Sequence, residues 1–341
     1  MRVLLVGAGA VGQVYGRHLQ LGGAQLSYYV RPKYLEQLRG GLTLYPLNEG
    51  RAARTQGVQL GDYALLSRPD EVAAQQWDQV WLCIPSDALA GPWLAPFLAA
   101  IGDATLVALP PGLEDRARLL ESAALDEAQL VTGQITFMAW QAPLPGEAAS
   151  RYPEPGTAYW FAPGSPSNFD GPSPRVEAVV AALRAGQCPA RVSASTAAAI
   201  HQTVAISLPM MAALELAGWS LRSLRRGPML ATGLAAAREA MVIAARHRGV
   251  PVGLGPALLR AWILRPLIAL APLFLPFDLE AFLAWHFSKV GGQTRAALQT
   301  YLERAHGEGA RLPSEAIAEL ARRLPELEAG PALAQLAASE S

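Results

Sequence analysis

The chain opens with a run of apolar positions, followed by glycines and then by a helical pattern. Residues 1–6 contain Val3, Leu4, Leu5 and Val6 with no polar position between them, which is typical of a parallel strand buried on both faces. Residues 10–21 have helical character, and a second apolar segment follows over residues 25–30. The pattern therefore predicts a strand, a helix and a second strand.

Comparable apolar runs recur through the first part of the chain, and helix-forming sequence separates several of them. We interpret these runs as strands over residues 42–45, 79–84, 105–109, 130–140, 157–162 and 190–192. Residues 46–62 are predicted to be loop or edge strand, and the proline-rich residues 141–174 are predicted to be mainly loop. Strands that alternate with helices predict an α/β fold with a doubly wound parallel sheet, to which residues 130–140 and 157–162 would add strands.

Strand patterns disappear from residue 193 onward. Long helices are predicted instead, over residues 195–218, 228–248, 278–306 and 313–323. The chain is therefore expected to have two domains, a Rossmann-type domain at residues 1–192 and an all-helical domain at residues 193–341.

One segment of the predicted helical domain is strongly apolar. Residues 254–277 are interrupted by Arg260 and Arg265 and by Pro266, Pro272 and Pro276, and the charge-free part, residues 266–277, is too short to cross a bilayer. We interpret this segment as buried helix and turn, or as a surface that meets a subunit or a substrate, and expect no membrane partner.

Three glycines follow the first strand in the pattern G-x-G-x-x-G. Gly7 allows a tight turn, Gly9 allows the backbone to approach a pyrophosphate, and Gly12 allows the helix to pack close to the strand. The pyrophosphate would bind to the helix N-terminus, at Ala10 and Val11. The position between a strand and a helix favours a dinucleotide site over a glycine-rich turn without a ligand.

The end of the second strand predicts which dinucleotide binds. An acidic residue at this position holds the ribose 2′-hydroxyl of NAD, whereas an arginine accommodates the 2′-phosphate of NADP. At this position the chain reads Val30-Arg31-Pro32-Lys33, with two cations and no acidic residue. The two cations favour NADP(H), and the alternative is a solvated basic turn.

Two further turns belong to the same predicted site. Ligands of doubly wound sheets bind beyond the carboxyl ends of the strands. Ile84 and Pro85 end one buried strand, and Pro111 and Gly112 follow the next. These residues are therefore expected to line the dinucleotide crevice.

Composition sets limits on the class of protein. The chain has 341 residues, 51% hydrophobic and 16% charged, with a net charge of zero, which argues against nucleic-acid or acidic-membrane partners. Cys83 and Cys188 fit neither a metal spacing nor a disulfide framework. Met1 leads directly into the first strand, so a cytoplasmic protein without a signal peptide is expected.

These features together resemble the ketopantoate reductase (2-dehydropantoate 2-reductase) family. The resemblance rests on residues 7–12 (GAGAVG), Arg31, Gly41-Leu42, Gly112-Leu113, and Glu239-Ala240 followed by Gly249-Val250. It implies an N-terminal Rossmann domain, a helical C-terminal domain, and NADPH and substrate in a cleft between the two domains. Residues 1–45 are the specific part of the match.

The catalytic positions of that family do not match. The resemblance implies a lysine near Gln202 and a substrate-binding asparagine near Ile206, and neither residue type is present there. Pro85 and Pro111 stand where the family has a lysine and an asparagine, and the family's C-terminal serine and glutamate have no clear counterpart. Loss of a general acid typically costs 10²–10⁴-fold in rate.

Other residues are candidates for the missing proton donor. Lys289 and His286 are three residues apart, and Gln293 is four further on, so all three would share one face of a continuous helix. His201 and Gln202 lie early in the helical domain. The alternatives are a solvated polar face for Lys289 and a core position for His201.

Two functions follow from this sequence. The first is an NADPH-dependent oxidoreductase that reduces a 2-keto acid or a related carbonyl compound, with Lys289 as donor assisted by His286, Gln202 or His201. The second is a non-catalytic NADP-binding sensor or scaffold that has kept the cofactor site. The expected partners are a small carbonyl substrate and a second copy of the chain, bound through the helical domain.

Overall fold

The computed structural model describes residues 1–110, 112, 114–121, 125–148, 151–194, 196–289, 291–307 and 311–325. It divides into two compact units, residues 1–201 and residues 202–341. The division falls within helix α8 (Thr196–Leu216). Pro111 lies outside the described residues.

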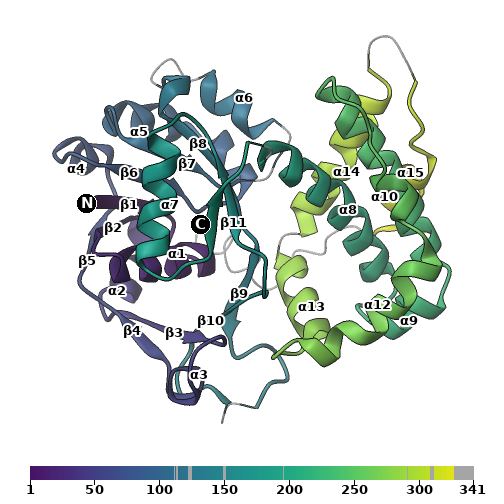
Figure 1. The fold of residues 1–341 in the computed structure, drawn as a ribbon, viewed down its shortest axis with the longest axis horizontal. Coiled ribbons are helices and arrows are strands. Elements are labelled where there is room, and N and C mark those ends of the chain that lie inside the picture. Colours follow the sequence, from purple (N-terminus) through teal and green to yellow (C-terminus); the bar gives the residue numbers. More distant parts are fainter. Residues whose placement is uncertain are drawn as a thin grey trace, which may run out of the picture. The chain divides into compact units, whose positions relative to one another are not determined.

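The first unit is built on an eight-stranded sheet with the strand order β12-β11-β8-β7-β6-β1-β2-β5. All neighbouring pairs are parallel except β11 with β8. This is the predicted Rossmann-type sheet (Figure 1). Its strands are β1 (Arg2–Val6), β2 (Gln25–Tyr29), β5 (Tyr63–Leu66), β6 (Gln79–Leu82), β7 (Thr105–Ala108), β8 (Leu130–Gln134), β11 (Ser167–Asp170) and β12 (Ala190–Val192).

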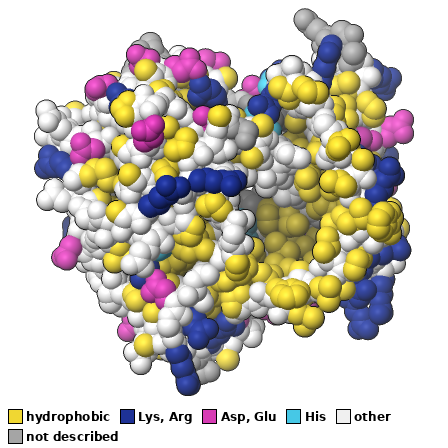
Figure 2. Space-filling view, viewed as in Figure 1, with side chains coloured by type: hydrophobic (Ala, Val, Ile, Leu, Met, Phe, Trp, Pro, Cys, Tyr) yellow, Lys and Arg dark blue, Asp and Glu magenta, His cyan; other side chains and the backbone are white. Residues whose placement is uncertain are grey.

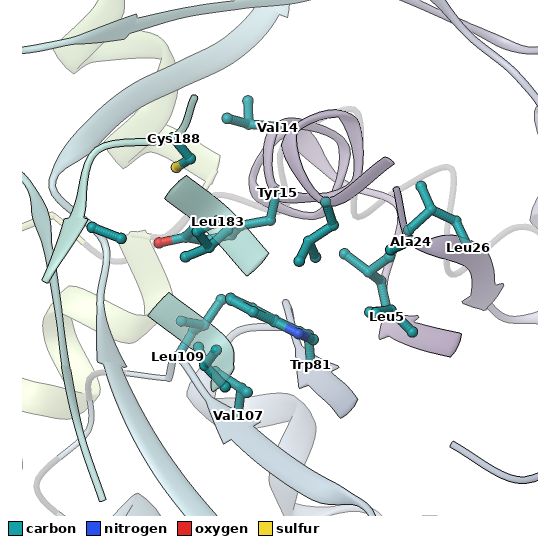
Figure 3. Close-up of a cluster of buried hydrophobic side chains, with 14 of the residues drawn as sticks. Leu5, Val14, Tyr15, Ala24, Leu26, Trp81, Val107, Leu109, Leu183 and Cys188 are labelled. Atoms are coloured by element: carbon teal, nitrogen blue, oxygen red, sulfur yellow. The ribbon is translucent and has the colours of Figure 1, made fainter. Parts of the chain in front are cut away.

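Successive strand residues point to opposite faces of this sheet. Both faces carry apolar side chains, and helices cover both. Val3 and Leu5 belong to the core under helices α1 and α7, whereas Leu4 and Val6 belong to the core under α4, α5 and α6. Tyr15 packs on Trp81 with 5.0 Å between ring centroids (Figure 3). The helices are α1 (Ala10–Leu21), α7 (Arg175–Ala185), α4 (Pro69–Ala73), α5 (Leu94–Ala100) and α6 (Asp115–Leu120).

A second sheet of four strands corrects part of the prediction. Its order is β4-β3-β10-β9. The strand expected over residues 130–140 is two strands, of which β8 extends the main sheet as predicted, whereas β9 pairs with β10 in the second sheet. Their antiparallel pairing explains the difference, since Gly156 to Phe161 run against Ala142 to Phe137. The strands are β3 (Leu42–Pro46), β4 (Val58–Leu60), β9 (Phe137–Ala142) and β10 (Gly156–Phe161).

Short elements lie within the segments for which loop was expected. Residues 46–62 contain helix α3 (Arg51–Gln56) and β4, and β4 is an edge strand of the second sheet, which agrees with the edge-strand alternative. Strand β11 lies within residues 141–174. Strands of three or four residues between prolines and glycines carry too few positions for a visible alternation. Helix α2 (Leu35–Leu38) and the 3₁₀ turns η1 (Pro32–Tyr34), η2 (Ser86–Ala90) and η3 (Glu127–Gln129) complete the unit.

A buried histidine joins α1 to the second sheet. The Nδ1 of His18 donates a hydrogen bond to the carbonyl oxygen of Gly186 at 2.7 Å, and the hydroxyl of Tyr159 lies 3.2 Å from Nε2. Arg17 donates to the same hydroxyl at 2.6 Å. Burial lowers the pKa of His18 to about 4, although the bond to Gly186 opposes that shift. The imidazole is therefore neutral at pH 7.

The second unit is helical, with no strand among its described residues. Helices α8 and α10 approach closely at Gly233, where a Cβ would lie 2.7 Å from the Cβ of Ala213. Glu239 of α10 accepts hydrogen bonds from the backbone N–H groups of Ala316 and Ile317, which begin α15. The helices after α8 are α9 (Leu221–Arg226), α10 (Met229–His247), α11 (Gly255–Leu258), α12 (Ala261–Phe274), α13 (Leu279–Lys289), α14 (Gly291–Ala305) and α15 (Glu315–Arg323).

The helix expected over residues 278–306 is described as α13, up to Lys289, and α14, from Gly291. Val290 between them lies outside the described residues. The segment 254–277 forms helix and turn, but α12 contains no buried residue, so the expectation of a buried helix is wrong for α12. The alternative, a surface that meets a subunit or a substrate, stays a prediction.

One helix among the described residues, α8, is long and apolar enough to span a membrane. Several of its residues pack inside the protein, including Ala205, Ala212, Ala213 and Leu214, which are fully buried. Helix α10 packs against it, as at Gly233. This contact is typical of the core helix of a folded domain.

Candidate functional site

The turn between β1 and α1 has the close approaches that its glycines predict. Gly7 has a φ of +95°, and a Cβ there would lie 2.9 Å from the carbonyl oxygen of Cys83. A Cβ on Gly12 would lie 2.1 Å from the carbonyl oxygen of Gly7. Side chains are therefore excluded at both positions, by backbone conformation at Gly7 and by contact at Gly12.

Gly9 differs from these two glycines because its surroundings are open. It is exposed, and nothing lies within 4 Å of the place where a Cβ would stand. It begins α1, whose first turn carries no acidic residue and receives no side-chain cap. The N–H groups of Ala10, Val11 and Gly12 precede the first intrahelical bond, which Gln13 donates to Gly9. These N–H groups and the helix dipole favour an anion such as a pyrophosphate.

The two predicted cations lie beside this turn. The N–H of Gly7 donates to the carbonyl oxygen of Tyr29 at 3.0 Å, which places the end of β2 next to the glycines. Arg31 and Lys33 follow that strand, and both are exposed. The Lys33 ammonium stands 5.4 Å from the ring centroid of Tyr34. Both charges are accessible to a phosphate group.

The strand ends β6 and β7 lie at the same edge of the sheet, as the topology predicts. Ile84 is half-buried with its Cγ2 atom 2.9 Å from the Cβ position of Gly7, and Pro85 is exposed. Gly112 is half-buried after β7. Of these residues, Ile84 is next to the glycine turn, and Gly112 follows β7, which β6 separates from β1.

A carboxylate that the sequence analysis did not select links these two strand ends. One carboxylate oxygen of Asp115 accepts a hydrogen bond from the Ser86 hydroxyl at 2.6 Å and another from the N–H of Gly112 at 2.7 Å. Asp115 is 5% exposed. A Cβ on Gly112 would lie 2.6 Å from this carboxylate, so the glycine is required for the contact. Asp115 therefore fixes the loops after β6 and β7.

A weak signal for this contact exists in the sequence. Asp115 follows Gly112 by three residues and opens α6, a spacing at which a side chain can bond a preceding backbone N–H. Ser86 lies 29 residues away from Asp115, and its role becomes visible only when β6 and β7 pair. Local patterns carry no information on that pairing.

The candidate proton donors lie on two helices. His201 is half-buried and Gln202 is exposed, both on α8. The amide nitrogen of Gln202 lies 3.0 Å from the Cβ position of Gly255. His286 of α13 is exposed and stacks on Phe282, with 5.5 Å between ring centroids. Lys289 is the last residue of the same helix, and Gln293 belongs to α14. Val290 lies outside the described residues, so the three-residue face stays a prediction.

Comparison with known proteins identifies the fold. No protein-family model matches the sequence, and no curated protein sequence matches it. Among solved structures, a PanE/ApbA-family ketopantoate reductase from Ralstonia eutropha JMP134 matches with a TM-score of 0.69 and 18% identity, over 94% of this chain and 96% of the other. The 2-dehydropantoate 2-reductase from Geobacter metallireducens GS-15 matches with a TM-score of 0.66 and 16% identity, over 94% and 98%.

A third matching structure is that of a dehydrogenase. D-mandelate dehydrogenase in complex with NADH and anilino(oxo)acetate matches with a TM-score of 0.69 and 12% identity, over 94% of this chain and 96% of the other. The chain therefore has the fold of ketopantoate reductases, and the resemblance predicted from the sequence is confirmed at the level of the fold. At these identities the comparison identifies architecture alone.

Proposed function

We propose that this protein is an NADP(H)-dependent oxidoreductase that reduces a 2-keto acid or a related carbonyl compound. The observation that carries the proposal is the turn from Gly7 to Gly12, which is closed to side chains at both ends and open at Gly9. The fold supports it, because the similar structures include reductases and a dehydrogenase solved with NADH and an oxo acid.

The residues of the first unit have distinct parts in binding. The free N–H groups at the start of α1 receive the pyrophosphate, and Gly9 leaves space for its approach. Arg31 and Lys33 receive the 2′-phosphate of NADP, since a guanidinium pairs well with a phosphate. The neighbour solved with NADH makes NAD the competing cofactor, and the absence of an acid between Arg31 and Lys33 argues for NADP.

Reduction requires a proton at the carbonyl oxygen. NADPH, when bound, would supply the hydride, and an acidic group of the protein would supply the proton. We assign that part to Lys289, the second of the two lysines in the chain, with His286 beside it on α13. Gln202 and His201 are the alternative donors of hydrogen bonds to the substrate.

The test is NADPH oxidation by the purified protein with ketopantoate and with bulkier 2-keto acids, followed by absorbance. We expect turnover with at least one 2-keto acid and a fall of 10²–10⁴-fold in kcat for Lys289→Ala, in the range typical of a general acid. Lys289→Arg is the matched control. The guanidinium keeps the positive charge, but it does not release its proton near neutral pH. Undiminished turnover of Lys289→Ala would remove Lys289 from the mechanism.

A non-catalytic sensor or scaffold is the second candidate. The sequence lacks the family's catalytic residues, for example with Pro85 in place of a lysine, and this loss favours the second candidate. Its signature would be tight NADPH binding with no oxidation by any 2-keto acid. The cytoplasmic location and the homodimer expected from the sequence stay predictions.

A further inference from the structure

Exposed hydrophobic side chains are concentrated in one segment of the second unit. Of the thirteen large hydrophobic side chains that are exposed among the described residues, nine lie between residues 250 and 274. They include Leu254 (83% exposed), Leu258 (63%), Trp262, Leu273 and Phe274 (76% each). Figure 2 shows hydrophobic side chains gathered over the part of this unit that carries α12 and α13. Single exposed hydrophobic residues are ordinary, whereas a contiguous patch marks a binding surface.

Helix α12 is apolar on both its inner and its outer faces. It packs against α9 and α10, with Leu264 and Ile268 half-buried. Its outer face carries Trp262, Leu273 and Phe274. Arg265 is its one charged residue. A helix that is hydrophobic all round is normally buried or in contact with lipid, so the exposed face of α12 is expected to be covered in the cell.

Arginines outnumber acidic residues around this patch. Residues 240–277 contain four arginines and no acidic residue, and the exposed Asp278 and Glu280 follow. Glu280 accepts a hydrogen bond from the N–H of Leu221 at the start of α9. Arg260 and Arg265 are exposed on the segment itself, and Arg222 and Arg226 are exposed on α9, which packs against α12. Lysine and arginine side chains lie at the outer edge of the hydrophobic area in Figure 2. The net charge of zero describes the whole chain and conceals this local excess of positive charge.

The dimensions fit a helix that lies in a membrane surface. The 14 residues of α12 span about 21 Å, which is too short to cross a hydrocarbon core of about 30 Å. Helix α12 and residues 279–288 of α13 are together long and apolar enough to span a membrane, but the two helices are bent by 101° relative to each other. An apolar helix with exposed tryptophan and phenylalanine and with arginines beside it has the character of an interfacial helix.

We propose that α12 and the preceding residues 250–260 bind the surface of an anionic lipid bilayer, with the helix axis in the membrane plane. A second copy of the chain explains the charges less well. In a two-fold symmetric interface the same patch faces itself, so the arginines at its edge would meet arginines, whereas anionic lipid headgroups neutralise them.

The experiment is flotation of the purified full-length protein with unilamellar vesicles. We expect flotation with an equimolar mixture of phosphatidylcholine and phosphatidylglycerol, and little flotation with phosphatidylcholine alone. The double variant Leu273→Gln/Phe274→Gln should reduce the bound fraction at least about tenfold. Leu21→Gln/Val192→Gln changes two exposed hydrophobic residues of the first unit and is expected to bind as the wild type does.

A second variant tests the electrostatic part. Arg222→Gln/Arg226→Gln should weaken flotation at about 0.1 M salt, and raising the salt to about 1 M should weaken wild-type binding. Circular dichroism spectra of all variants serve as the check of folding. Failure of the wild type to float with the anionic vesicles would overturn the proposal, as would equal binding to both vesicle types. A concentration-dependent dimer that the Leu273→Gln/Phe274→Gln variant abolishes, without vesicle binding, would assign the patch to a second copy.

Discussion

Gly12 lies so close to Gly7 that a Cβ on Gly12 would stand 2.1 Å from the Gly7 carbonyl oxygen. Gly9, between them, has open space around its Cβ position. Gly7 and Gly12 therefore form the turn, whereas the open position at Gly9 supports the proposal that it admits the pyrophosphate.

We expect Gly12→Ala to destabilise the protein by about 1–3 kcal/mol, because the new methyl group overpacks the turn. Gly9→Ala should fold with a stability within about 0.5 kcal/mol of the wild type, since its φ of −71° suits alanine. The affinity of Gly9→Ala for NADPH should nevertheless fall at least about tenfold, because the methyl group meets the pyrophosphate. Urea unfolding and NADPH fluorescence titration measure the two quantities. Unchanged NADPH binding by Gly9→Ala would place the pyrophosphate elsewhere.

The cofactor preference depends on Arg31 and Lys33. The variant Arg31→Ala/Lys33→Ala should weaken NADPH binding by about 10–100-fold, the usual effect of removing charge-assisted hydrogen bonds to phosphate. NADH has no 2′-phosphate, so its affinity should change by less than about twofold. Arg54→Ala, an exposed arginine on α3, is the matched control. Equal losses for NADPH and NADH would contradict a specific 2′-phosphate contact.

The Asp115 carboxylate offers a test of how the site is held. Asp115→Ala leaves the Ser86 hydroxyl and the Gly112 N–H without their acceptor, which should cost about 1–3 kcal/mol of stability. Ser86→Ala removes one of these two bonds and should cost about 1 kcal/mol. Thermal unfolding of both variants measures the difference. A loss for Ser86→Ala as large as that for Asp115→Ala would show that the Gly112 bond contributes nothing.

His18 predicts a pH dependence of stability. Its pKa of about 4 in the folded protein lies below the ordinary value of 6.5. Between these two pH values the unfolded chain binds a proton that the folded protein does not, so stability falls as the pH decreases from about 6.5 to 4. The contribution of His18 is on the order of 3 kcal/mol.

The measurement is urea unfolding at several pH values between 4 and 7, for the wild type and for His18→Gln. Carboxylates also titrate in this range, and comparison with the variant separates their effect from that of His18. A wild-type pH profile parallel to that of His18→Gln would contradict the assignment.

Sequence patterns predicted the frame of the fold because it depends on local signals. The run from Val3 to Val6, the glycine spacing and the residues after β2 each carry their meaning within a few positions. The separate sheet that contains β9 and β10 was not predictable, since β10 also pairs with β3, which lies far from it in the chain. The link from Ser86 to Asp115 was hidden for the same reason.

The apolar segment 254–277 was interpreted as buried, or as a surface that meets a subunit or a substrate. Its composition was read correctly, but burial depends on what covers a helix, and α9 and α10 cover only part of α12.

The central claim is that the turn at Gly7 to Gly12, with Arg31 and Lys33, binds NADP(H). Titration of the purified wild-type protein with NADPH and with NADH, followed by cofactor fluorescence, tests it most directly. We predict saturable binding of NADPH at least about tenfold tighter than binding of NADH. Equal affinities would contradict the role given to the two cations, and the absence of binding to either cofactor would contradict the account as a whole.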